Sequence, residues 1–196
     1  EPQITSASIE KLGITTLLGH GESDFKGSSS SRIHNIKTGA AKFYGLLLKP
    51  GEEFSFNSVL GEVDGKGGYL YELVVKNGKL IPEFGGGICQ VSTTLFRAAV
   101  ATGLPILERR GHSLPVRYYN PQGFDATIYP GVIDLKFKND TSSNVLIQNK
   151  IEETKISFEI YGSEDGRKVE LDGPKIIEQT ESGSLKTILT RKTFLQ

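Results

Sequence analysis

Residues 85–103 read GGGICQVSTTLFRAAVATG and form the strongest helix signal in the chain. The apolar side chains recur at helical spacing and make one stripe, which consists of Val91, Leu95, Ala98 and Ala99. A second, more polar stripe consists of Gln90, Thr94, Arg97 and Ala101. Gly103 is a typical C-terminal stop, and Pro105 follows just beyond it. The stretch therefore predicts a helix that begins directly after three glycines and packs its apolar stripe on the core.

Cys89, the single cysteine of the chain, lies at the start of this predicted helix. The first turn of a helix carries unpaired N–H groups and the positive end of the macrodipole, and both favour a thiolate, which is the nucleophilic form. The N–H groups near Gly87–Gln90 could also hold an oxyanion during acyl transfer. A lone cysteine is more often a small buried hydrophobe, and that alternative stays open. A phosphate site is not expected, because the Lys-Ser/Thr ending of a P-loop is missing.

The other elements are expected on both sides of this helix. Residues 30–46 have helical spacing, with Ser28, Ser29 or Ser30 as the cap, and residues 3–18 suggest one or two strands before a loop at 19–29. Further expected features are a short strand with Phe54 and Phe56, a loop at 61–68, a hairpin of 69–75 and 79–81 around Asn77–Gly78, strand-like runs at 116–119, 127–129, 132–138, 145–148 and 155–160, and more strand-like pieces in 167–196. The predicted fold class is α+β, with a mostly antiparallel sheet packed against two main helices.

Composition excludes several classes of protein. The chain has 196 residues, which suits one domain, and its 23 basic and 23 acidic side chains balance, so nucleic-acid binding is not expected. No apolar run is long enough to span a bilayer. One cysteine and three scattered histidines predict neither a disulfide nor a metal site, and no cofactor is expected. Since the chain opens with Glu1 and has no Met, we expect it to be part of a longer product.

A thiolate needs a partner, and His112 in the segment ERRGHSLPVRYY is the best candidate. Catalytic and structural roles are equally compatible with His112, whereas His20 in a loop and His34 in a helix are expected to serve the surface or packing. Asp125 and Asp134 are candidates to orient the imidazole, although Gly-x-Asp clusters commonly shape turns. Arg109 and Arg117 could bind a carboxylate, and the alternative for both is a solvated strand edge.

Four blocks of sequence resemble the VanW domain. They are GGGICQVSTTLFRAAVATGL, ERRGHSLPVRYY, GFDATIYPGVIDLKFKN and RIHNIKTGAAKFYGLLLKPGEEFSFNSVLG, and the likeness extends over residues 28–162. Such domains occur in surface or secreted proteins of Gram-positive bacteria, which implies an extracytoplasmic place at the cell surface or wall. Some members are reported as L,D-transpeptidases. The resemblance implies a catalytic domain at 1–162, with Cys89 as nucleophile and His112 as base, and a C-terminal β extension at 163–196 that could lead into a neighbouring module.

Together with this resemblance, the residues predict a peptidoglycan L,D-transpeptidase that forms 3–3 crosslinks through a cysteine thioester, with stem peptides as its partners. The expected catalytic residues are Cys89, His112 and Asp125. The expected substrate-binding residues are Gly86, Gly87, Gln90, Ser92, Arg109, Ser113 and Tyr118. Three alternatives stay open. Water could replace the amine, which gives a cysteine carboxypeptidase or endopeptidase. The chain could instead be a wall-binding module with a buried Cys89, or a partner-binding domain that tunes glycopeptide resistance.

Overall fold

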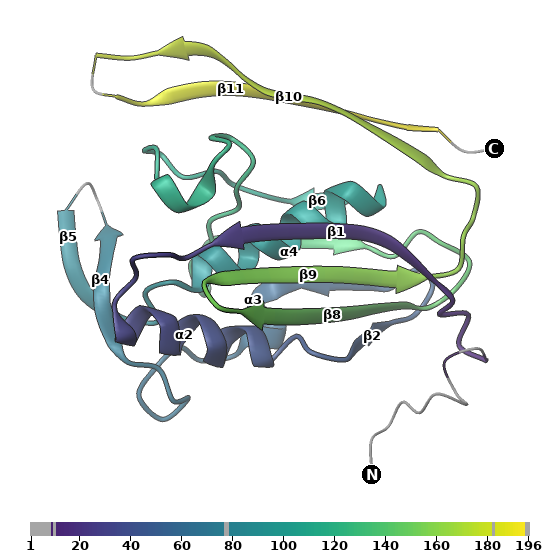
Figure 1. The fold of residues 1–196 in the computed structure, drawn as a ribbon, viewed down its shortest axis with the longest axis horizontal. Helices are drawn as coiled ribbons and strands as arrows, with labels where there is room; N and C mark the ends of the chain where they lie inside the picture. Colours follow the sequence, from purple (N-terminus) through teal and green to yellow (C-terminus); the bar gives the residue numbers. More distant parts are fainter. Residues whose placement is uncertain (1–8, 10, 77–78, 182, 195–196) are drawn as a thin grey trace.

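The structure is a computed structural model that describes residues 9, 11–76, 79–181 and 183–194. The principal elements, in chain order, are β1 (Thr16–Asp24), α2 (Ser30–Ala41), β2 (Leu46–Leu48), β3 (Glu53–Ser55), α3 (Phe56–Leu60), β4 (Tyr71–Lys76), β5 (Lys79–Phe84), α4 (Ile88–Thr102), β6 (Ile106–Glu108), the 3-10 turn η1 (Arg117–Tyr119), β7 (Lys136–Lys138), β8 (Val145–Glu152), β9 (Lys155–Gly162), β10 (Lys168–Gln179) and β11 (Leu185–Phe194) (Figure 1). The predicted α+β class, with α2 and α4 as its two main helices, is confirmed.

Antiparallel pairing joins all the strands. The largest sheet has the order β1-β9-β8-β2, a second sheet has the order β3-β7-β6, and β4-β5 and β10-β11 are hairpins. Helix α4 packs across β1 and β9 of the largest sheet. One hydrophobic core includes residues of α4 and of both multi-stranded sheets, and aromatic stacking contributes to it, with the rings of Phe54 and Phe137 4.3 Å apart. None of the described helices is long and apolar enough to cross a membrane.

Every residue of α4 except Cys89 and Ala101 is buried. The predicted apolar stripe is therefore confirmed, and the polar residues Gln90, Thr94 and Arg97 of the second stripe are buried as well because their side chains are paired. Thr94 Oγ1 lies 2.6 Å from Ser23 Oγ of β1. The Arg97 guanidinium donates to four backbone carbonyls, those of Glu22, Tyr119, Asn120 and Phe124. These bonds tie the helix to the segments around it and leave Cys89 partly accessible at its start.

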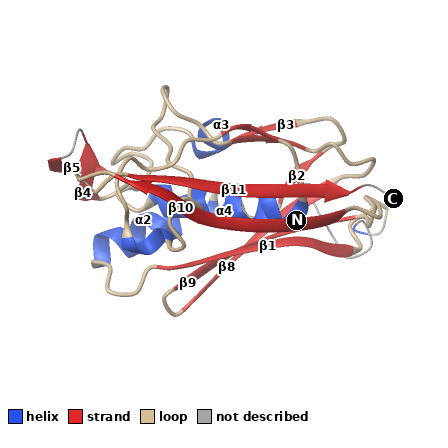
Figure 2. Cartoon of the chain, turned by 90° about the horizontal axis from the view of Figure 1, so that it is seen from above, coloured by secondary structure: helices blue, strands red, loops and turns tan. Residues whose placement is uncertain are grey.

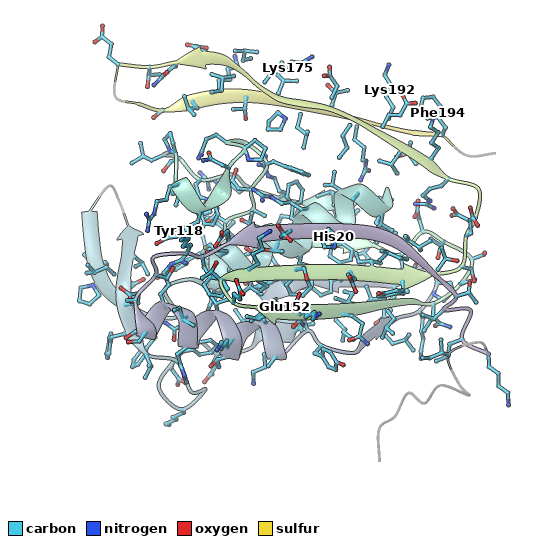
Figure 3. All side chains as sticks on the ribbon, in the orientation of Figure 1. His20, Tyr118, Glu152, Lys175, Lys192 and Phe194 are labelled. Carbon is cyan, nitrogen blue, oxygen red and sulfur yellow. The ribbon has the colours of Figure 1, made fainter. Side chains whose placement is uncertain are left out.

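The loop predicted at residues 19–29 is wrong at its beginning, because β1 extends to Asp24. Its glycines belong to a close helix–strand contact. A Cβ at Gly21 would lie 2.4 Å from Thr94 O, and one at Gly19 would lie 2.1 Å from Thr102 Oγ1. Glycine inside a strand often marks such a close approach rather than a loop. His20 consequently lies on a strand, as Figure 3 shows, and not in a loop.

Other predicted boundaries need correction. The helix predicted to reach residue 46 ends at Ala41, because Leu46–Leu48 pairs with β8 and Gly45 turns the chain at φ +75°. The predicted strand with Phe54 and Phe56 ends at Ser55, which caps α3. Of the strand-like runs, 116–119 contains η1, 127–129 makes only isolated bridges, and 132–138 is strand only from Lys136.

Several other predictions are confirmed in full or in part. Ser29 is the cap of α2, as one of the three predicted serines. The strands at 145–148 and 155–160 are confirmed within β8 and β9. Both strands of the predicted hairpin are present as β4 and β5, whereas its Asn77–Gly78 turn lies outside the described residues. In the region 3–18, where one or two strands were predicted, the described structure has a strand that begins at Thr16. Residues 1–8 and 10 lie outside the described residues.

The C-terminal residues form the long hairpin β10–β11, which crosses over the body on the side of α4 and η1 (Figures 1 and 2). Arg167 and Arg191 hold this hairpin against the body by hydrogen bonds. Arg191 Nη1 donates to Leu104 O at 2.7 Å, and Arg167 Nη1 donates to Gly103 O at 3.2 Å and to Asp140 Oδ1 at 2.9 Å. The C-terminal extension thus packs back on the chain near the end of α4.

Candidate active site

Cys89 lies in the first turn of α4, and its side chain is half-buried. Its Sγ is 3.6 Å from Thr127 Oγ1, and the thiol donates to Ile128 O at 3.5 Å. The segment with Thr127 and Ile128 therefore lies directly against the nucleophile candidate. Ser92, one turn along α4, donates to Ala126 O at 2.6 Å and holds this segment in place.

The three glycines before Cys89 are each packed against a different part of the chain. A Cβ at Gly85 would lie 2.3 Å from Val63 Cγ1, and one at Gly86 would lie 2.7 Å from Glu72 Cβ. Gly87 has φ +113°, and a Cβ there would lie 3.0 Å from Arg32 Cγ. Larger residues would push these neighbours away and move the start of α4. The glycines thus fix the position of Cys89.

Two residues of helix α2 hold the glycine loop and the start of α4 by hydrogen bonds, and the sequence had indicated no role for either of them. The Arg32 guanidinium donates to Gln90 Oε1 at 2.8 Å, and Gln90 Nε2 donates to Ser23 Oγ at 3.1 Å. Asn35 is fully buried, and its Nδ2 donates to Gly86 O at 3.2 Å. Arg32 and Asn35 are three residues apart, which places them on one face of a helix. That spacing, present in the segment RIHNI, is the signal that could have revealed them.

His112 and Asp125 form a close pair. His112 Nδ1 lies 2.5 Å from Asp125 Oδ2, and the same oxygen accepts the His112 backbone N–H at 2.8 Å. Arg109 holds the carboxylate from the other side, with Nη2 3.3 Å from Asp125 Oδ1 and Nε donating to Asp125 O at 2.6 Å. Burial raises the pKa of Asp125, but its hydrogen bonds with the side chain and backbone of His112 outweigh this effect and lower it. Asp125 is therefore ionised and fixes the imidazole.

The imidazole of His112 lies close enough to the thiol of Cys89 for each group to shift the pKa of the other. Burial lowers the pKa of His112, yet the hydrogen bonds with Asp125 and Cys89 raise it overall to about 9. Burial raises the pKa of Cys89, yet the hydrogen bond and charge of His112 lower it overall. Both shifts favour the thiolate of Cys89 and the imidazolium of His112. The ring of Tyr119 stacks on His112 with centroids 4.4 Å apart, which limits rotation of the imidazole.

Asp134, the other acid considered for orienting the imidazole, lies elsewhere. Its carboxylate accepts from Ser55 Oγ at 2.6 Å and from the Asn57 N–H at 2.9 Å, at the start of α3. Arg117 donates to the Tyr118 hydroxyl at 2.8 Å. Among the described side chains, Asp125 is the carboxylate that meets His112.

Some of the predicted substrate-binding residues are bonded within the protein, and others line cavities near Cys89 or His112. The side chains of Gln90 and Ser92 are fully buried and bonded within the protein, so they could influence a substrate only by holding α4 and its neighbours. Arg109 is likewise engaged with Asp125. Gly86 and Gly87 line a cavity beside Cys89, and Ser113 lines a smaller one beside His112. Tyr118, labelled in Figure 3, lies under the Arg32 guanidinium at 4.0 Å from its ring centroid.

Two cavities flank the Cys89–His112 pair. The larger cavity has a volume of about 760 Å³ and is lined by Cys89, the three glycines before it and residues of the strands β4 and β5. The smaller, about 260 Å³, is lined by His112, Asp125 and the beginning of β11, so the C-terminal hairpin contributes one of its walls. Among the described residues, no cluster of three His, Cys, Asp or Glu side chains could hold a metal ion.

Comparison with known proteins agrees with these motifs. The family described as "VanW like protein" matches residues 31–161. The chain is 36% identical over 163 residues to the uncharacterized protein YoaR of Bacillus subtilis (strain 168), and the match covers 83% of this chain and 53% of YoaR. It is 34% identical over 163 residues to the vancomycin B-type resistance protein VanW of Enterococcus faecalis (strain ATCC 700802 / V583), covering 81% of this chain and 56% of that protein.

The chain thus spans about half the length of these relatives. No solved structure matched it. The resemblance seen in the sequence is confirmed over residues 31–161, the range in which Cys89, His112 and Asp125 lie. The protein belongs to the VanW-like family.

Proposed function

We propose that this chain is a cysteine acyltransferase that acts on peptidoglycan stem peptides as an L,D-transpeptidase. The observation that carries the proposal is the series Cys89–His112–Asp125. Cys89 lies in the first turn of a buried helix, His112 is close enough to lower the pKa of Cys89, and Asp125 Oδ2 lies 2.5 Å from His112 Nδ1. A nucleophile, a base and a group that orients the base are the arrangement that covalent acyl transfer requires. The name of one relative, a vancomycin B-type resistance protein, agrees with the bacterial cell wall as the place of action.

In the first step, the Cys89 thiolate attacks the carbonyl carbon of the amide that follows the third residue of a stem peptide. The C–N bond breaks, and the His112 imidazolium gives its proton to the departing amine of D-alanine. The product is a thioester on Cys89, and the imidazole is left neutral. Asp125 keeps the Nδ1 proton of the ring in place, so the other ring nitrogen is the one that exchanges a proton.

In the second step, the side-chain amine of another stem attacks the thioester. Neutral His112 accepts the proton of this amine, the C–S bond breaks, and the thiolate–imidazolium pair is restored. The product is an amide between the third residues of two stems, which is a 3–3 crosslink. No metal or cofactor takes part in these proton and acyl transfers.

Backbone N–H groups at the start of α4 would stabilise the oxyanion of each tetrahedral intermediate. The N–H groups of Ile88 and Gln90 donate inside the loop, to Gly85 O at 3.0 Å and to Gly87 O at 2.9 Å. Within the described residues this leaves the N–H groups of Gly87 and Cys89 as the available donors. Two N–H groups beside a nucleophile suit an oxyanion.

The test is to incubate the purified protein with disaccharide-tetrapeptides and to identify the products by mass spectrometry beside Cys89→Ala. We expect a crosslinked dimer that has lost one D-alanine, formed by the native protein and not by the variant. Free tripeptide without dimer would instead indicate that water is the acceptor. If several stem types yield no Cys89-dependent product, the proposal is wrong and a non-catalytic wall-binding role replaces it.

A further inference from the structure

The cavity of about 760 Å³ beside Cys89 has the size of a ligand site rather than of a packing defect. Its walls come from four separate parts of the chain, namely residues 62–64, the β4–β5 hairpin, the glycine loop with Ile88 and Cys89, and residues 128–130. Because Cys89 is part of the lining, a group bound in this cavity lies next to the reacting sulfur. The cavity therefore determines which chemical groups approach the thioester.

Aromatic and apolar side chains make up much of its surface. The rings of Tyr71 and Phe84 pack with centroids 3.9 Å apart on the β4–β5 hairpin, and Val63, Pro82 and Ile128 are among the other apolar residues of the lining. The alkyl portion of a long side chain can lie along such a wall, and aromatic faces attract cations.

The charged side chains of the same cavity have one sign. Among the described residues that line it, the formally charged ones besides Cys89 are the carboxylates Glu62, Asp64 and Glu83. Asp64 Oδ1 accepts the Gly67 N–H at 2.7 Å and so also shapes its own turn. Glu62 is exposed, which places it where solvent enters. Carboxylates beside aromatic rings favour a positively charged ligand.

We propose that this cavity binds the ammonium-bearing side chain of a diamino acid in the stem peptide, with Glu62 as a specificity-determining residue. The inference rests on the proposed function, because a stem peptide is the ligand. The alkyl chain lies on the apolar wall, and the ammonium group is held among the carboxylates. Both stems of a 3–3 crosslink contain such a residue, so the occupant is either the donor or the acceptor.

Binding tests the proposal without any turnover. A stem tripeptide whose third residue is lysine is titrated into Cys89→Ala by calorimetry, beside the same peptide with its side-chain amine acetylated. We expect the free amine to bind at least about threefold more tightly, as one partly exposed ion pair permits, and Glu62→Gln to remove this preference. Glu152→Gln is the matched control, since Glu152 lies on β8 and is absent from the cavity lining (Figure 3).

Equal binding of the two peptides by the native cavity would overturn the proposal. The Cys89→Ala background keeps this outcome separate from a failure of acyl transfer, because the binding measurement needs no reactive sulfur. Loss of the preference in Glu152→Gln as well as in Glu62→Gln would also count against it, since a general effect of charge would then explain the result.

Two kinetic arms then identify the occupant. In the first, thioester formation on Cys89 is followed with donors whose side-chain amine is free or acetylated. In the second, the preformed thioester is treated with a free-amine stem or with hydroxylamine, a nucleophile that is uncharged at neutral pH. A selective effect of Glu62→Gln on the free-amine donor assigns the cavity to the donor, and one on the stem acceptor assigns it to the acceptor. The absence of a selective effect in both arms would overturn the assignment.

Discussion

Replacing Asp125 by Asn tests how the charge of His112 is maintained. The pKa of His112 stands at about 9 rather than 6.5, which corresponds to about 3 kcal/mol of preference for the protonated ring. Among the groups that raise this pKa, the carboxylate of Asp125 is the foremost, and its Oδ2 is 2.5 Å from the ring nitrogen. Asparagine keeps the shape and removes the charge, so we expect the pKa of His112 to fall by at least about one unit.

The assay is an NMR titration of the imidazole carbon-bound protons. The chain contains only three histidines, and His112→Gln assigns the relevant signal. Asp140→Asn is the matched control, because Asp140 is a more exposed carboxylate that pairs with Arg167 and is not among the groups that shift the pKa of His112. A His112 pKa that remains near 9 in Asp125→Asn would refute the reasoning, as would a pKa near 6.5 in the native protein.

Three further predictions concern the same architecture. In His112→Gln the pKa of Cys89 should rise, so alkylation by iodoacetamide at pH 7 should slow by at least about tenfold, and an unchanged rate would contradict the ion pair. Because the folded-state pKa of His112 is raised, its stabilising contribution is complete below about pH 6.5 and disappears as the pH rises through about 9. The difference in urea midpoint between native protein and His112→Gln should therefore shrink between pH 6 and pH 10. A difference that stays constant over this range would contradict the raised pKa of His112. Gly21→Ala should lower stability by about 3 kcal/mol in urea unfolding, since its Cβ would lie 2.4 Å from Thr94 O, whereas Gly65→Ala, whose Cβ meets only ordinary contacts, should change little.

The fold class and the helix with Cys89 were predictable because their signals are local. Helical spacing and a C-terminal glycine define α4, and Gly103 adopts the expected left-handed conformation. The extent of β1 was not predictable, since Gly19 and Gly21 resemble loop residues unless the crossing of α4 is known. For the same reason the helix expected to reach residue 46 was too long, because the pairing of Leu46–Leu48 with β8 is a contact between distant segments.

The candidate site shows the same division between local and distant information. Cys89, His112 and Asp125 were singled out by residue type and by resemblance, and the structure brings their side chains together. The choice between Asp125 and Asp134 required the fold, because both follow His112 in sequence and only one lies beside it. The buried support from Arg32, and the wall that β11 adds near His112, come from segments remote in sequence.

The central claim is that Cys89 becomes acylated by a stem peptide, and intact-protein mass spectrometry tests it most directly. The native protein is mixed with a disaccharide-tetrapeptide donor in the absence of an amine acceptor and is quenched in acid, beside Cys89→Ser. The account predicts an added mass equal to the donor without D-alanine, located on Cys89 and released by hydroxylamine. If several donors give no adduct although Cys89 reacts readily with iodoacetamide, the thiolate is not used for acyl transfer and the account is contradicted.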